Sequence, residues 1–158
     1  MKNQENVLYI PKIELGIVID HIPAGKGLKI LDIISRYEEM KDVVVTLGQN
    51  YYSKKLGKKD LIKLQMDFLA PEIIQHISIV VPGVTIKAIK NFKVHNKVVV
   101  HPPKEIRNLL ACKNPKCITN QERHIGTKFT AVDDTIKEVR CNYCERVFKL
   151  SELDVSNR

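Results

Sequence analysis

The stretch KDLIKLQMDF, at residues 59–68, decides how the first two-thirds of this chain is interpreted. Successive side chains of a strand point to opposite faces. In a strand, one face would carry Asp60, Ile62, Leu64 and Met66, and the other would carry Lys59, Leu61, Lys63 and Gln65. A helix stays possible, because Leu61, Leu64 and Phe68 also recur near a period of 3.6. We favour the strand, since Pro71 is typical of the first turn of a separate helix that follows.

The sequence on either side of this strand divides into further short elements at its glycines and prolines. We expect a strand at 15–19 closed by residues 20–23, a helix at 28–37, a strand at 43–47 ended by residues 48–50, a helix at 72–80, and strands at 84–89 and 92–100. With the strand at 59–68 included, the first six elements follow the order β-α-β-β-α-β, and the strand at 92–100 completes the sheet. This order predicts an α+β fold, the ferredoxin-like antiparallel sheet with two helices on one face.

A stiff joint is predicted at His101-Pro102-Pro103, because consecutive prolines continue neither a helix interior nor a sheet ladder. The joint separates a domain of residues 1–101 from a small, β-rich domain of residues 102–158. All the cysteines of the chain lie in the second domain.

The cysteines form two tight pairs, Cys112 with Cys117 and Cys141 with Cys144. Each pair has the spacing of a turn that presents two sulfurs to one ion, so the four thiolates predict one structural zinc ion per chain. Free buried cysteines and a redox dithiol are the alternatives, but a redox dithiol does not need a second pair. Because the chain supplies all four ligands, we expect no catalytic role for the metal.

Charge, hydropathy and missing motifs limit the ligands, the location and the activity that the sequence predicts. The formal net charge is +8, and five lysines fall within residues 54–63, which indicates nucleic acid, an acidic protein surface, a polyphosphate ligand or simply a solvated lysine face. There is no apolar run of about 20 residues and no signal-like start, so we expect a cytoplasmic protein without membrane contact. Phosphate-binding loops, nucleophile elbows and open metal sites are also missing from the sequence, which argues against an enzyme.

Four motifs occur in order along the chain: VIDHIPA at residues 18–24, GKKDLIK at residues 57–63, Asn91-Phe92 with Lys97, and the unequal cysteine pairs followed by Glu145. Together they resemble the regulatory chain of aspartate carbamoyltransferase over nearly the whole length. The resemblance implies a non-catalytic subunit of pyrimidine biosynthesis that binds CTP and ATP as allosteric effectors.

The resemblance also implies site residues and partners. It assigns the nucleotide to Asp20, His21, Lys59, Lys63 and Lys97, with the base near the backbone of residues 10–13 and 87–89. It assigns contacts with the catalytic chain to Asn114 and Glu145 in the zinc domain, either of which could instead be a local turn or cap residue. Another regulatory chain is a further expected partner.

Three positions, Pro11, Phe92 and Lys87, depart from the family pattern, so phosphate binding is implied more strongly than a base preference. A zinc-ribbon protein that binds nucleic acid is the alternative function. Scattered charge and scarce aromatic residues count against it, and we expect no nucleic acid among the partners.

Overall fold

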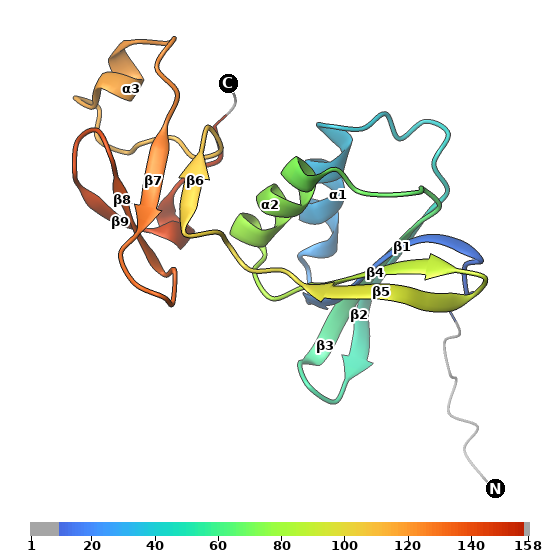
Figure 1. The fold of residues 1–158 in the computed structure, drawn as a ribbon. Coiled ribbons are helices and arrows are strands. Elements are labelled where there is room, and N and C mark those ends of the chain that lie inside the picture. Colours follow the sequence, from blue (N-terminus) through green and yellow to red (C-terminus); the bar gives the residue numbers. More distant parts are fainter. Residues whose placement is uncertain (1–9, 157–158) are drawn as a thin grey trace, which may run out of the picture. The chain divides into compact units, whose positions relative to one another are not determined.

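The structure, a computed structural model, describes residues 10–156, which divide into two compact units (Figure 1). The first, called here the sheet unit, contains the described residues up to Ile73 together with Gly83–Val99. The second, called here the cysteine unit, contains Ile74–Pro82 and the chain from Val100 onward.

The sheet unit is built on a five-stranded sheet in the order β2-β3-β1-β4-β5, in which every neighbouring pair is antiparallel. The strands are β1 (Leu15–Pro23), β2 (Val45–Ser53), β3 (Gly57–Leu64), β4 (Thr85–Lys90) and β5 (Lys93–Val99). Helix α1 (Gly27–Ser35) lies on one face of the sheet, and so does the first turn of α2 (Pro71–Val80), whose remaining residues belong to the cysteine unit. The predicted α+β class and antiparallel sheet are confirmed. The strand predicted over residues 59–68 is confirmed only in part, because β3 ends at Leu64 and residues 65–68 lie outside any strand.

Two β-bulges change the predicted strand boundaries. One lies in β1 between Ile19 and Ile22, and the other lies in β2 between Gly48 and Tyr51. Residues 20–23 and 48–50 were expected to end their strands, but both segments continue within β1 and β2. The reason is that a bulge accommodates an extra residue without ending the pairing.

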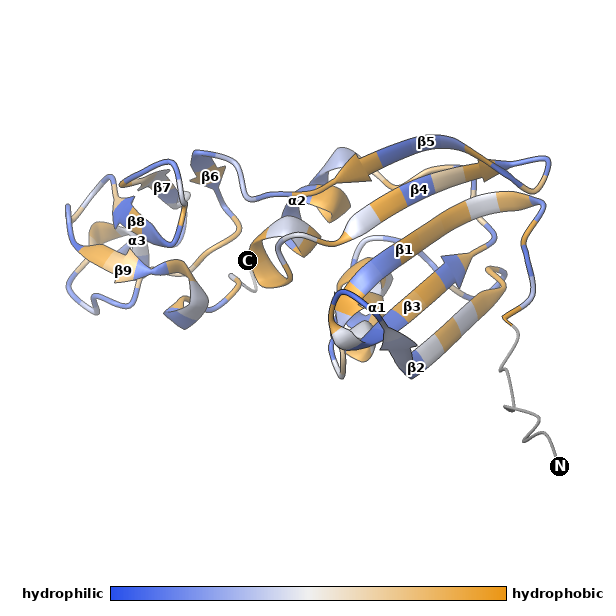
Figure 2. Ribbon diagram, turned by 90° about the horizontal axis from the view of Figure 1, so that it is seen from below, coloured by the Kyte–Doolittle hydropathy of each residue, from blue (hydrophilic) through white to orange (hydrophobic). Residues whose placement is uncertain are grey.

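The core of the sheet unit is rich in isoleucine. Ile17 and Ile19 of β1 point to the same face as their cross-strand partners on β3 and β4, and α1 adds Ile30 and Ile34. In β4, Ile86 and Ala88 pair with these two isoleucines of β1, and Figure 2 shows a hydrophilic band between hydrophobic ones along this strand. The bulge shifts the alternation of β1 by one residue, so that Ile22 is also fully buried.

Asp60 of β3 accepts hydrogen bonds from backbone amides near both bulges. It is fully buried, and its Oδ2 accepts hydrogen bonds from the backbone amides of Gly25 and Gly27, each at 2.9 Å. Its Oδ1 accepts a bond from the amide of Asn50 at 3.0 Å. Asn50 has a φ of 60°, in the left-handed region that is uncommon for residues other than glycine, and this hydrogen bond stabilises it there.

The cysteine unit contains a second antiparallel sheet in the order β6-β7-β8-β9. Its elements are β6 (Glu105–Arg107), α3 (Ile118–Gln121), β7 (Lys128–Ala131), β8 (Glu138–Cys141), β9 (Val147–Lys149) and the short 3₁₀ helix η1 (Leu150–Glu152). Phe129, Ile106 and Val139 pack with three of the cysteines in its core. Within residues 10–156, no helix has the length and apolar character needed to cross a membrane.

Candidate anion-binding face and cysteine cluster

The sheet face opposite α1 carries a row of lysines. In the strand register, Lys63 of β3 lies opposite Val18 of β1, Val18 lies opposite Lys87 of β4, and Lys87 lies opposite Lys97 of β5. Directly opposed residues share a face of the sheet, so the three lysine side chains project to the same side. Asp20 projects to this side as well, since it follows Val18 by two residues in β1.

Asp20 places a carboxylate on this face, and two ammonium groups share it. Lys59 Nζ lies 2.6 Å from Asp20 Oδ1, and Lys87 Nζ lies 2.8 Å from Asp20 Oδ2. Burial on its own raises the pKa of Asp20, but the hydrogen bonds from Lys59 and Lys87 outweigh it and hold the pKa well below its usual range. The carboxylate is therefore ionised at neutral pH.

His21 occupies the bulge of β1 with a φ of 58°. Its backbone amide donates to Asp20 Oδ1 at 2.7 Å, while its ring Nδ1 is buried and makes no hydrogen bond within the described residues. Burial lowers the pKa of His21; Asp20 opposes this, and Lys59 and Lys87 add to it. Asp20 Oδ2 lies 3.8 Å from this nitrogen, too far for a hydrogen bond. A buried nitrogen without a hydrogen-bond partner is costly, and a ligand that accepts a hydrogen bond from it or donates one to it would relieve that cost.

Lys63 and Lys97 differ in their surroundings. Lys63 is buried, which lowers its pKa, and its ammonium group donates to the backbone carbonyl of Pro11. Lys97 is exposed on β5, at the edge of the sheet. Among the described residues, neither ammonium group has a carboxylate within ion-pair distance. Both remain available for an anion.

The structure therefore brings the five sequence-predicted residues of the first domain onto one sheet and places a cationic surface around Asp20. Sequence reasoning missed the side chain of Lys87, for which only a backbone role was considered. The signal was present, because Lys87 stands between Ile86 and Ala88 in a strand whose alternation points its side chain away from the core. This arrangement is suited to binding a multiply charged anion.

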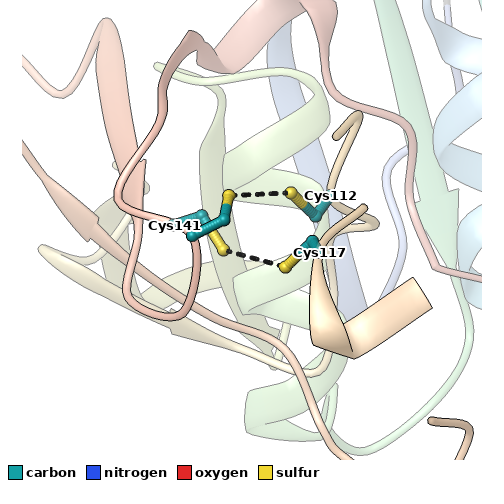
Figure 3. Close-up of side chains that lie close together, drawn as sticks. Cys112, Cys117 and Cys141 are labelled. Carbon is teal, nitrogen blue, oxygen red and sulfur yellow. Dashed lines mark hydrogen bonds between the residues drawn. The ribbon is translucent and has the colours of Figure 1, made fainter. Parts of the chain in front are cut away.

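The second site is the cluster formed by Cys112, Cys117, Cys141 and Cys144. Their sulfur atoms all lie within 4.8 Å of one another, although the two pairs come from separate parts of the cysteine unit. The sulfurs of Cys112 and Cys144 are 3.7 Å apart, and those of Cys117 and Cys141 are 3.8 Å apart. Figure 3 shows Cys112 and Cys117 side by side, facing Cys141. The four sulfurs are close enough to ligate one metal ion.

The surroundings of the sulfurs suit a cation. Burial raises the pKa of the Cys112 and Cys141 thiols, so their thiolate forms need a compensating positive charge. Burial also raises the pKa of Cys144, but the backbone amide of Arg146 and neighbouring groups lower it to about 7. The hydroxyl of Thr119 lies 3.2 Å from the sulfur of Cys117, where it can donate a hydrogen bond. The donor set therefore fits a metal that prefers thiolates.

The two residues predicted to contact a partner differ in exposure. Asn114 is buried inside the first cysteine turn, where its carbonyl accepts bonds from the amide of Cys117 at 2.9 Å and from the side chain of Asn120 at 2.8 Å. Glu145 is exposed just after the second pair and has a φ of 60°. Asn114 thus has a local structural role, and a contact with a partner stays a prediction for both residues.

The fold and the two sites define a protein with a charged sheet unit and a metal-binding unit. The model of the aspartate carbamoyltransferase regulatory chain, allosteric domain, matches residues 8–101. The model of the metal binding domain of the same regulatory chain matches residues 104–154.

Curated relatives agree with both matches. The regulatory chain of aspartate carbamoyltransferase from Pyrococcus horikoshii is 42% identical over 146 residues, which cover 92% of this chain and 95% of the relative. The relative from Pyrobaculum islandicum is 43% identical, with 92% and 97% covered, and that from Thermoplasma acidophilum is 36% identical, with 96% and 98% covered. The chain belongs to the family of aspartate carbamoyltransferase regulatory chains, and it is a regulatory rather than a catalytic subunit.

Proposed function

We propose that this chain binds CTP and ATP on the lysine-bearing face of its sheet unit and transmits their effect to catalytic chains of aspartate carbamoyltransferase in pyrimidine biosynthesis. Residues 1–101 are the effector domain, and residues 102–158 are a domain that one zinc ion holds together. The protein acts in the cytoplasm, and nucleic acid is not among its ligands.

The proposal for the effector rests on one observation, the carboxylate of Asp20 with more lysines near it than it can pair. Lys63 and Lys97 have no carboxylate partner among the described residues, and they lie in one row across the sheet. A triphosphate would neutralise this excess through charge-assisted hydrogen bonds. His21 is proposed to donate a hydrogen bond to the ribose or the nearest phosphate. Asp20, an anion, is proposed to accept hydrogen bonds from the ribose hydroxyls or to hold His21 and a lysine in place, and Lys59 is a further cation for the phosphates.

The proposal for zinc rests on the geometry of the sulfurs. A tetrahedral ion with Zn–S bonds of about 2.3 Å requires sulfurs separated by roughly 3.8 Å. The Cys112–Cys144 and Cys117–Cys141 separations of 3.7 and 3.8 Å agree with that requirement, and all four sulfurs lie within 4.8 Å of one another. Cys112, Cys117, Cys141 and Cys144 are then all ligands, so the ion is structural.

Two surfaces are proposed for partners. The turns around the zinc contact the catalytic chain, with Asn114 shaping the first turn and Glu145 exposed beside the second. The edge strand β2 pairs with a second regulatory chain, which is supported by its free edge and by the exposure of Val44 and Val45. An effector changes catalytic activity only through a difference in its affinity for the two states of the assembly.

Calorimetric titration of the full chain with CTP tests the effector assignment. Lys63→Ala removes an ammonium group that has no carboxylate partner among the described residues, and should weaken CTP binding roughly tenfold or more, since hydrogen bonds to charged groups contribute about 1.5–3 kcal/mol. Lys29→Ala is the matched control, because Lys29 is an exposed lysine of α1, on the other face of the sheet. Undiminished CTP affinity in Lys63→Ala would count against the assignment.

Salt-dependent binding of a short DNA duplex by the unmodified chain would favour the nucleic-acid alternative.

A further inference from the structure

Lys87 is a lysine of the same sheet face that is not among the residues of the proposed effector site. It lies directly opposite Lys97 on the neighbouring strand, and like charges in that arrangement repel each other. Its ammonium group is drawn to Asp20 at 2.8 Å, although Asp20 already binds Lys59 at 2.6 Å. One carboxylate therefore holds two cations.

The excess of one positive charge over Asp20 is partly buried, which strengthens its attraction for an anion. The side chains of Lys59 and Lys87 are each 22% exposed, and that of Asp20 is 10% exposed, so solvent screens these charges less than it screens a surface pair. Either lysine can leave Asp20 without stranding a buried, unpaired carboxylate, because the other lysine stays.

The strand register distinguishes the two lysines. Lys87 belongs to the row that runs from Lys63 to Lys97, whereas Lys59 lies opposite Pro23 at the end of β1. An anion that bridges Lys63 and Lys97 must therefore pass over Val18 and Lys87. Lys87 is the cation at the centre of the face.

We propose that Lys87 binds the phosphate chain of the effector, and that Asp20 holds its ammonium group in place until the ligand arrives. When a nucleotide binds, the Lys87 ammonium group exchanges the Asp20 carboxylate for a phosphate oxygen, and Asp20 remains paired with Lys59. This inference rests on the proposed nucleotide site and adds a residue through which the site discriminates ligands by phosphate charge.

The test compares adenosine, AMP, ADP and ATP as ligands of the full chain. In the unmodified protein, affinity should rise with each added phosphate. Lys87→Gln should shrink the ratio of ATP affinity to AMP affinity by roughly tenfold, the loss expected for one charge-assisted hydrogen bond, and leave adenosine affinity unchanged. Lys87→Arg should retain the ratio of the unmodified chain, and Lys29→Gln, which removes a lysine from α1, should retain it too.

The possible outcomes separate this inference from the function beneath it. If the unmodified chain binds none of the four ligands, the proposed effector function fails and Lys87 loses its role with it. If the unmodified chain binds ATP and Lys87→Gln keeps the same ratio, only the role of Lys87 is overturned. Equal weakening of adenosine and ATP also overturns it, because Lys87 would then act by positioning Asp20. Thermal melting checks that Lys87→Gln is folded, and Lys87→Met, which keeps the aliphatic stem, replaces it if it is not.

Discussion

The sheet unit and the cysteine unit reach a folded core by different means. In the sheet unit, isoleucines of β1, β3 and α1 meet between a helix and a sheet, and polar side chains are left for the opposite face. In the cysteine unit, Cys112, Cys117 and Cys141 are themselves members of the core, beside a few large apolar residues such as Phe129. The first unit can thus vary its charged face without losing its core, whereas the second depends on what its sulfurs bind.

Removal of the metal should give the largest effect and should separate the two units. Metal binding contributes roughly 10 kcal/mol or more to the folding of small thiolate sites, so a chelator should unfold residues 104–154. In a heteronuclear NMR spectrum, the amide resonances of β6–β9 should collapse to unfolded positions. Resonances of β1, β3 and β4 should stay dispersed, because their core contains no cysteine.

The readout for docking is assembly with the catalytic chain, which should be lost with the metal and restored by added zinc. If the cysteine unit stays folded after complete metal removal, verified by elemental analysis, its core does not depend on the metal and the proposed difference between the two units is wrong.

Replacement of Asp60 should give a smaller effect, confined to the sheet unit. Asp60→Ala leaves the backbone amides of Gly25, Gly27 and Asn50 without their acceptor, and should lower the free energy of unfolding by about 3 kcal/mol or more. Asp60→Asn retains one acceptor oxygen and should cost less. Urea unfolding of the sheet unit measures both, and the metal affinity of the cysteine unit should be unchanged. A loss of metal binding in Asp60→Ala would show that the cores are not independent.

The sequence predicts the cores better than it predicts the charged face. Alternation at residues 59–64 and the spacing of the cysteine pairs are local patterns, and both are retained in the structure. The bulge at His21 is different, because its conformation depends on pairing with β3, which lies about forty residues further along the chain. The Asp20–Lys87 pair depends likewise on the register between β1 and β4, which the buried isoleucines fix. Long-range contacts of this kind have no signal in a local window.

The pH dependence of effector binding should give the smallest effect and should sharpen the contrast, because it belongs to the sheet unit alone. Burial depresses the pKa of His21 in the free chain, with Lys59, Lys87 and Lys55 acting in the same direction and Asp20 opposing them. His21 therefore stabilises the fold at pH values above its unfolded pKa of about 6.5, and this stabilisation is lost as the pH falls through the lower folded value.

A bound phosphate would raise the pKa of His21, so binding takes up a proton and CTP affinity should increase about threefold as the pH falls from about 7.5 to 6. The ratio of CTP affinity in the unmodified chain to that in His21→Gln isolates this effect, because the titration of the ligand's own phosphate cancels. Parallel pH profiles for the two proteins would mean that His21 does not face the phosphates. The metal content should stay constant across the range in both proteins, since a change in it would assign the pH dependence to the cysteine unit instead.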